Sequence, residues 1–265
     1  MKTQQDLNTL YFEVEKVKSS DLFKGHTFVS GIDHTIYAPQ SKKILNVCSD
    51  KYELVSNHSL FNPIYTLLCD RFGKDMIEVK VQNIEDRKFY VDLIVNNKPF
   101  NVQKGDIVCP TVHLHNSYDG TLKFGMAVGF HRLVCTNGMM AFQEEAARNL
   151  KHRSGVVNFK ELFVLLDNVD SQLERFRKLT DRRLTPKEME QITELIKEKT
   201  DFPKQLIKEV PEVIAREQIQ LNTDLTGWLA YHGFNNRLNH ADIKMHPEFK
   251  EKIDRQVLNV IEIFN

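Results

Sequence analysis

The chain lacks a net charge, a long apolar run and a glycine-rich phosphate loop. Lys and Arg together number 36, as do Asp and Glu, so the formal charge is zero. No overall positive field therefore exists to attract nucleic acid or an anionic membrane. No stretch approaches the ~18 apolar residues needed to cross a bilayer. None of the 11 glycines falls into G-x-x-x-x-G-K-[ST] or G-x-G-x-x-G, which excludes a P-loop nucleotidase and argues against a dinucleotide fold.

Cysteine is scarce and widely spaced. The four cysteines form no C-x-x-C pair, and we expect them to be reduced and mostly buried. They are Cys48, Cys69, Cys109 and Cys135. The polar beginning, MKTQQDLNTLYFEVEKVKSS, lacks the apolar core of a signal peptide. We therefore expect a soluble, cytoplasmic protein with no membrane partner.

The composition is that of an ordinary globular protein, with 41% hydrophobic and 27% charged residues in 265 positions. The first half predicts one early helix over 62–73, with Asn62 as its N-cap, Pro63 in its first turn and Gly73 at its end. Strong helix formers predict another helix over 139–153. Runs rich in Val, Ile, Tyr and Phe predict extended segments at 26–38, 43–48, 77–81, 88–95, 107–115 and 122–135.

The second half has helical periodicity. Apolar residues recur at steps of three and four over 158–179. The sequence Thr185-Pro186-Lys187-Glu188 has the form of a capping box, and His246-Pro247 is expected to open a last helix. This half is therefore predicted to be mostly helical.

These patterns predict an α+β fold. We expect an antiparallel sheet of about four or more strands with flanking helices, followed by a mostly helical C-terminal half. The predicted sheet domain covers 1–154, and the helical region over 155–265 packs on it. The boundary is placed at Ser154-Gly155, although no Gly- or Ser-rich linker marks it.

Two turns are specified by residue type. Asp119-Gly120 is a strong hairpin signal between the segments 107–115 and 122–135. Asn137-Gly138 is expected to turn the chain where the second of these segments ends. In both pairs the glycine supplies the positive φ that such turns require.

Histidine and cysteine gather on the two strands of this hairpin. Alternation places Cys109, His113 and His115 on one face of the first strand, and His131 and Cys135 on one face of the second. A zinc site is sterically feasible if those faces coincide, but no tight ligand spacing supports it. We expect core cysteines and polar-face histidines, with no metal and no cofactor.

Positive charge is concentrated in two places. The first cluster ends the predicted helix over 139–153, where the helix dipole alone accounts for basic residues. The second surrounds the Thr185 cap, where a dipole explains less and phosphate contact is an alternative. The first cluster consists of Arg148, Lys151, His152 and Arg153, and the second of Arg175, Arg177, Lys178, Arg182, Arg183 and Lys187.

Arg132 needs its own explanation because it lies on a predicted strand. A charged side chain on a sheet requires water, an ionic partner or a ligand. Two roles remain open from the sequence, a structural ion pair and contact with a ligand.

Two motifs in the centre of the chain carry a family resemblance. They are Asn116-Ser-Tyr-Asp-Gly120 and, after it, His131-Arg-Leu-Val-Cys-Thr-Asn-Gly-Met139. The chain resembles the phage/plasmid-like protein family, that is, domain of unknown function nine-three-two. Further positions that resemble the family are Tyr52-Glu-Leu-Val-Ser-Asn57, Thr226-Gly-Trp-Leu-Ala-Tyr231 and Asn239-His240, so the resemblance covers about 45 to 240.

The resemblance supplies no activity to carry over. By element order and mobile-element context, the family is similar to single-strand annealing proteins of the RecT type, which hold DNA in a groove of an oligomer. This analogy of folds is a weak guide to function. It implies single-stranded DNA as a partner and self-association.

Our leading hypothesis is a single-stranded nucleic-acid-binding protein, an annealing or recombination accessory that oligomerises. Its expected contacts are Lys123, Arg132, Arg148, Lys151, Arg153, Arg182 and Arg183. The alternative is a phage-encoded protein-interaction or host-inhibitory module, which would show scattered charges and an exposed apolar patch. An enzyme with a pocket near Cys135 and His131 ranks third, because no catalytic motif is present.

Overall fold

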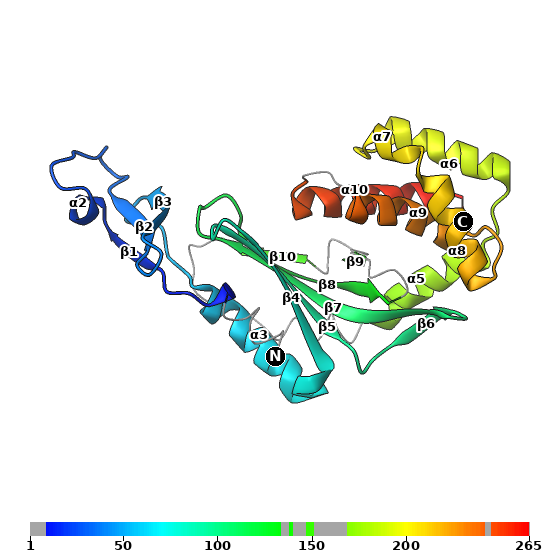
Figure 1. Cartoon of the computed structure of the whole chain (residues 1–265), viewed down its shortest axis with the longest axis horizontal. Helices are drawn as coiled ribbons and strands as arrows, with labels where there is room; N and C mark the ends of the chain where they lie inside the picture. The colour runs from blue at the N-terminus through cyan, green and yellow to red at the C-terminus, as the bar shows by residue number, and fades with distance from the viewer. Residues whose placement is uncertain (1–8, 134–137, 140–146, 151–168, 242–244, 265) are drawn as a thin grey trace. The chain divides into compact units, whose positions relative to one another are not determined.

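The computed structural model describes residues 9–133, 138–139, 147–150, 169–241 and 245–264 (Figure 1). The chain forms two compact units that alternate along the sequence. The first takes its described residues from Met1–Asn97, Thr111–Ala127 and Glu144–Phe163. The second takes them from Lys98–Pro110, Val128–Gln143 and Val164–Asn265. The predicted boundary at Ser154-Gly155 lies outside the described residues.

Two antiparallel sheets account for the extended segments. The small sheet has the order β1-β2-β3, and the seven-stranded sheet has the order β10-β8-β7-β5-β4, with β6 on β7 and β9 on β8. The small sheet consists of β1 (Glu15–Lys18), β2 (His34–Ala38) and β3 (Lys43–Cys48), and the short α2 (Ser19–Leu22) follows β1. The large sheet consists of β4 (Ile77–Ile84), β5 (Lys88–Val95), β6 (Phe100–Gln103), β7 (Asp106–Ser117), β8 (Phe124–Arg132), β9 (Gly138–Met139) and β10 (Ala147–Leu150).

Helix α3 (Asn57–Phe72) precedes the large sheet, and the 3-10 turn η1 (Lys74–Met76) follows it. Its N-cap is Ser56, whose hydroxyl accepts a hydrogen bond from the Ser59 N–H. The prediction that Asn62 caps this helix was therefore wrong. Pro63 lies inside the helix, which has one further turn before it, whereas Gly73 ends it as predicted.

The predicted helix over 139–153 was also wrong in the part that the structure describes. Residues Ala147–Leu150 form β10, which pairs antiparallel with β8 from Ala127 to Phe124. Helix propensity differs by less than ~1 kcal/mol among ordinary residues. A free strand edge offering backbone hydrogen bonds can override such a preference.

The C-terminal half is mostly helical, as predicted. Its helices are α5 (Val169–Asp181), α6 (Pro186–Lys199), α7 (Lys204–Ile207), α8 (Val210–Leu221), α9 (Gly227–His240) and α10 (Pro247–Glu262). Thr185 and Glu188 form the expected capping box, and His246 is the N-cap of α10. These findings confirm the α+β class, with antiparallel sheets first and helices after them.

Helix α9 is the centre of the second unit. It packs against α5, α7, α8 and α10, and its Trp228, Tyr231 and Phe234 are fully buried. The backbones of α8 and α9 approach closely at Gly233, where an added Cβ would lie 2.6 Å from Ile214 Cγ1. None of the helices in the described part of the chain has both the length and the hydrophobicity of a membrane span.

We expect Gly233→Ala to destabilise the protein. The added methyl would overlap Ile214, and overpacking of this kind costs about 1–3 kcal/mol. Because α8 is held against α9 at this point, we expect this cost to exceed the gain of about 1 kcal/mol in helix propensity. Urea denaturation of the variant should show a lower free energy of unfolding than wild type. Glu212→Ala, on the exposed side of α8, serves as the control, and equal stabilities for both variants would contradict the close packing.

Candidate nucleic-acid interface

Helix α3 covers one face of the part of the large sheet that belongs to the first unit. The Phe61 ring on this helix lies 6.1 Å from the Phe124 ring of β8. The Phe89 ring of β5 lies 5.3 Å from that of Tyr118, whose hydroxyl accepts a hydrogen bond from the Asn57 N–H at the start of α3. Phe89 and Phe124 therefore lie on the face that carries α3.

The opposite face of the sheet, which we call the polar face, follows from strand alternation. It carries Lys88, Tyr90 and Asp92 of β5, and the register of β5 with β7 adds His115 opposite Tyr90 and His113 opposite Asp92. Lys123 is the exposed residue immediately before β8, on the other side of β7. The polar face thus combines rings, hydrogen-bonding groups and Lys88, with Lys123 beside it.

Contacts between β5 and β7 order the side chains of the polar face. A hydrogen bond of 2.7 Å joins His113 Nδ1 to an Asp92 carboxylate oxygen, and the Tyr90 and His115 ring centroids lie 6.2 Å apart. Tyr90 and His113 are buried, whereas Asp92 and His115 are half-buried. Asp92 and His115 are therefore the groups of this set that a ligand meets first.

Two hairpin turns lie side by side at one end of this sheet. The Tyr118 N–H donates to the Arg87 carbonyl at 2.8 Å, which joins the β7–β8 turn to the β4–β5 turn. A Cβ on Gly120 would lie 3.2 Å from Asn46 Nδ2 of β3, and Lys43 of β3 forms an ion pair with Asp86. This ion pair lowers the pKa of the Asp86 carboxyl, since its hydrogen bond with Lys43 favours the charged form.

Lys88 and Lys123 flank this end of the sheet. Lys88 lies opposite Ser117 in the strand register, and the Ser117 hydroxyl accepts a hydrogen bond from the Leu122 N–H at 2.9 Å. Both lysines thus lie close to the same turn, one on each side of β7. Within the described chain, neither lysine forms an ion pair, and Lys123 is exposed.

The two predicted turns are placed differently by the structure. Asp119 accepts hydrogen bonds from the N–H and hydroxyl of Thr121, and Gly120 has a φ of 72°. The Asp119-Gly120 prediction is therefore confirmed. Gly138 begins β9 and pairs with His131, and Asn137 lies outside the described residues.

Arg132 lies in the interior of the second unit. Its guanidinium donates to both carboxylate oxygens of Asp106, with 2.7 Å from Nε to Oδ1, and to Glu217 Oε2, also at 2.7 Å. The Trp228 indole N–H donates to Asp106 Oδ2 at 2.7 Å. We call these four residues the Asp106 cluster.

The Asp106 cluster decides between the two roles that the sequence left open for Arg132. The side chains of Arg132 and Asp106 have 0% of their surface exposed, and that of Glu217 has 4%. A phosphate cannot reach a guanidinium that is enclosed in this way. Arg132 is therefore a partner in a structural ion pair, and we remove it from the predicted interface.

The second basic cluster is tied to acidic residues of its own unit. Arg182 forms an ion pair with Glu188 and donates from Nε to the Phe264 carbonyl at 2.7 Å. Arg183 lies 3.2 Å from Asp224, but its side chain is 80% exposed. Two further arginines, Arg175 and Arg177, pair with Glu262 and Glu174. The cluster is consequently less positive than its sequence suggests.

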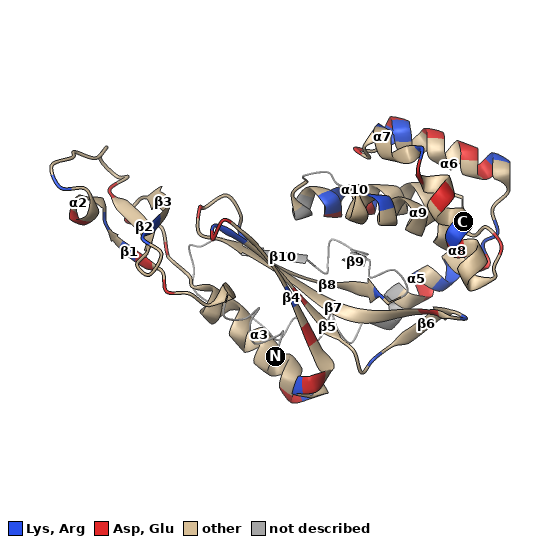
Figure 2. Cartoon of the chain, viewed as in Figure 1, with Lys and Arg blue, Asp and Glu red and all other residues tan. Residues whose placement is uncertain are grey.

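Little of the first basic cluster can be placed. Arg148 lies in β10, and its backbone pairs with that of Met126 in β8. Lys151 and Arg153 lie outside the described residues. Across the rest of the chain, Lys and Arg are interspersed with Asp and Glu (Figure 2). The predicted set of nucleic-acid contacts loses Arg132, because its side chain is 0% exposed.

The histidines and cysteines for which a zinc site was sterically feasible have different surroundings in the structure. Cys109 and His131 are buried in β7 and β8, His113 is bonded to Asp92, and Cys135 lies outside the described residues. Among the residues described, no group of three or more His, Cys, Asp or Glu side chains is arranged to hold a metal ion.

Residues from different motifs of the family resemblance contact one another in the structure. Asn116 donates from Nδ2 to Asn57 Oδ1 at 2.9 Å, and Tyr118 accepts from the Asn57 N–H at 2.8 Å. Burial raises the pKa of Tyr118 to about 12, which keeps its hydroxyl protonated. In the same way, Arg132 and Trp228 come from different motifs and meet on Asp106.

Some partners in these networks had no sequence signal. Asp106 and Glu217 look like ordinary surface acids in the sequence, and only their contacts identify them as buried. His232 was missed too, although it is fully buried, with its ring 4.2 Å from that of Trp228. Both of its ring nitrogens lack a hydrogen-bond partner in the described part of the chain. Burial, and secondarily the charge of Arg132, hold the pKa of His232 well below its usual range.

Arg132→Met should be strongly destabilising. It leaves two buried carboxylates without their cation, a loss that typically costs about 3–5 kcal/mol. Arg183→Met removes an exposed ion pair and should cost about 0–1 kcal/mol. Chemical denaturation of both variants compares a buried arginine with an exposed one, and similar losses would contradict the importance of the Asp106 cluster.

His232 should make the protein less stable in acid. In the unfolded chain this imidazole takes up a proton below pH ~6.5, whereas the folded protein keeps it neutral. Its contribution is therefore complete above pH ~6.5 and falls at lower pH, with a slope of up to ~1.4 kcal/mol per pH unit. NMR of the ¹⁵N-labelled imidazole should show His232 neutral at pH 5.5, and a titration midpoint at or above 6.5 would contradict this.

Comparison with known proteins identifies one family. The family model for a domain of unknown function, DUF932, matches residues 44–257, which is more than half of the chain. No curated protein and no solved structure matches the chain. The matched region contains the Asp106 cluster, the polar face and the bonded motif residues. The chain therefore belongs to the DUF932 family.

Proposed function

We propose that this protein binds single-stranded nucleic acid through the polar face of its first unit, as an annealing or recombination accessory that oligomerises. The observation that carries the proposal is the position of Lys88 and Lys123 beside a sheet face bearing the Tyr90 and His115 rings. Single strands are bound by a combination of cations along the backbone and rings that stack on bases.

The two lysines are suited to phosphate contact. No described acidic residue neutralises either of them, unlike Lys43 and Arg87, which pair with Asp86 and Glu85. His115 is half-buried and in ring contact with Tyr90, so a base stacking on it meets a supported surface. The resemblance to phage/plasmid-like proteins, and through them to annealing proteins, favours the same class of ligand.

This proposal uses a smaller surface than the set of contacts predicted from the sequence. Lys123 is retained and Lys88 is added, whereas Arg132 is excluded by its burial. Arg182 and Arg183 belong to the second unit and are not needed for contact with the polar face. Binding is expected to be weak and sensitive to salt, because few phosphates are neutralised.

A second candidate function rests on a different observation. Large aliphatic side chains are exposed on and beside the small sheet, namely Val29, Ile32, Ile44 and Val47. Exposed apolar residues in one region mark protein interaction sites when they form a continuous patch. A protein-interaction or host-inhibitory module would use such a surface. This function becomes the leading hypothesis if no oligonucleotide binds.

The test is fluorescence anisotropy of a labelled single-stranded oligonucleotide at low and physiological salt. The double variant K88E/K123E should weaken binding at least about tenfold. It should also reduce the slope of log K against log salt by about 1.4, since each lost phosphate contact on a single strand contributes about 0.7.

Lys74→Glu provides the matched control. Lys74 is exposed and precedes β4, whereas the β4–β5 turn lies at the other end of that strand pair. It should leave binding unchanged. Absence of wild-type binding at low salt, or equal weakening by K74E, would sink the proposal.

A further inference from the structure

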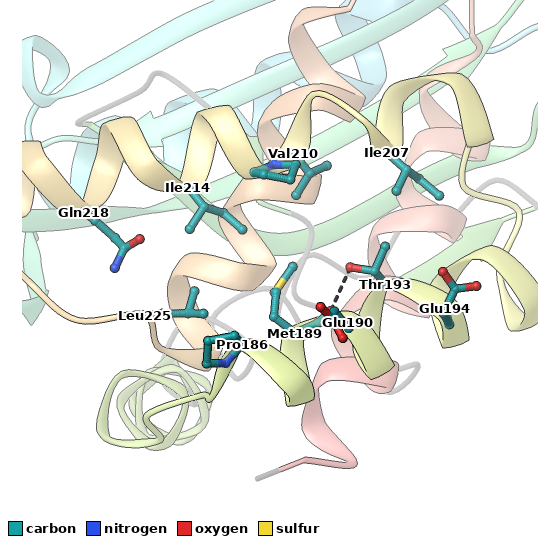
Figure 3. Close-up of a pocket in the computed structure, with 11 residues that line it drawn as sticks. Pro186, Met189, Glu190, Thr193, Glu194, Ile207, Val210, Ile214, Gln218 and Leu225 are labelled. Atoms are coloured by element: carbon teal, nitrogen blue, oxygen red, sulfur yellow. Dashed lines mark hydrogen bonds between the residues drawn. The ribbon is translucent and has the colours of Figure 1, made fainter.

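A groove of about 440 Å³ lies between α6 and α8 in the second unit (Figure 3). Its apolar lining comes from both helices and from the segments that flank them. The side chains that matter here are Met189 and Thr193 of α6, Ile207, Val210 and Ile214 on or before α8, and Leu225 after it. This volume is within the range of ~300–1,000 Å³ found for ligand sites.

The groove exists because α6 and α8 each pack mainly against another helix. The fully buried Ile192 and Ile196 belong to α6, which packs on α10. Helix α8 packs on α9, closely enough that Ile214 touches the Gly233 backbone position. Met189 and Thr193 are one turn away from Ile192 and Ile196 on α6 and lie beside them on the helix surface, where they line the space toward α8.

The charge on the rim has one sign. The charged residues that line the groove are Glu190 and Glu194, both exposed. Glu194 is paired with Lys197, whereas Glu190 forms no ion pair with any residue that the structure describes. An apolar floor beneath carboxylates is complementary to an apolar group that carries a positive charge beside it.

We propose that this groove docks a short segment of a protein partner, whose aliphatic side chains enter the groove while its Lys or Arg side chains face Glu190 and Glu194. The lining of α6 runs from Pro186 to Glu194, a rise of ~12 Å along a helix. This length matches about two turns of an amphipathic helix, which presents apolar anchors at i, i+3, i+4 and i+7.

The docking site is independent of the nucleic-acid proposal. Carboxylates repel phosphates, so a nucleic acid is disfavoured at this groove on charge alone. The groove lies in the second unit and the polar face in the first. Failure of one proposal consequently leaves the other standing.

The test uses two labelled model peptides of about ten residues with Leu at the helical anchor spacing. One carries Lys at the remaining positions and the other carries Glu. The full-length protein, labelled with ¹³C at its Met methyl groups, reports on the groove through Met189. The Leu/Lys peptide should shift the Met189 methyl signal and bind at least about tenfold more tightly than the Leu/Glu peptide.

Charge reversal on the rim separates docking from general attraction. E190K/E194K should weaken binding of the Leu/Lys peptide at least about tenfold. Because both residues are exposed, the variant should still fold. Glu198→Lys changes an exposed residue of α6 that does not line the groove, and it should have little effect. An unmoved Met189 signal, or equal weakening by E198K, would overturn the proposal.

Discussion

The ion pair between Asp106 and Arg132 is the interaction on which the packing of the second unit depends. The Asp106 carboxylate accepts two hydrogen bonds from Arg132 and one from Trp228, while Glu217 binds the remaining side of the guanidinium. These residues come from β7, β8, α8 and α9, so one buried ionic cluster connects two strands with two helices. Removing any one of these charged side chains leaves a buried charge without its partner, which lowers the free energy of unfolding.

The same principle explains why the most recognisable motifs are structural. Asn57, Asn116 and Tyr118 satisfy one another at the start of α3 in the first unit, as Arg132 and Trp228 do through Asp106 in the second. Polar groups that are buried must find partners, so residues far apart in the sequence are constrained together. A distinctive motif therefore locates a fixed point of the fold, and a binding surface is better sought among residues with unsatisfied charge.

On this chain, which has no net charge, residues with unsatisfied charge form only small surfaces. Most described arginines in the helical unit are held by acids, as Arg175 is by Glu262 and Arg182 by Glu188. Lys88 on the polar face, Lys123 beside it and Glu190 at the groove lack such partners within the described chain. The two proposed surfaces therefore differ in the sign of their charge, in their chemistry and in the unit that carries them.

The sequence by itself determined the local elements: the Thr185 capping box, the Asp119-Gly120 turn, the strands β4, β5, β7 and β8 of the large sheet and the α+β class. Such features depend on neighbouring residues, whose side chains and backbone angles are fixed by residue type. Only the tertiary structure decided that Ala147–Leu150 is a strand, that Arg132 is buried and that Asp106 and Glu217 are its partners. Strand pairing and the burial of charge depend on residues distant in the chain, and no local pattern specifies which of them will meet.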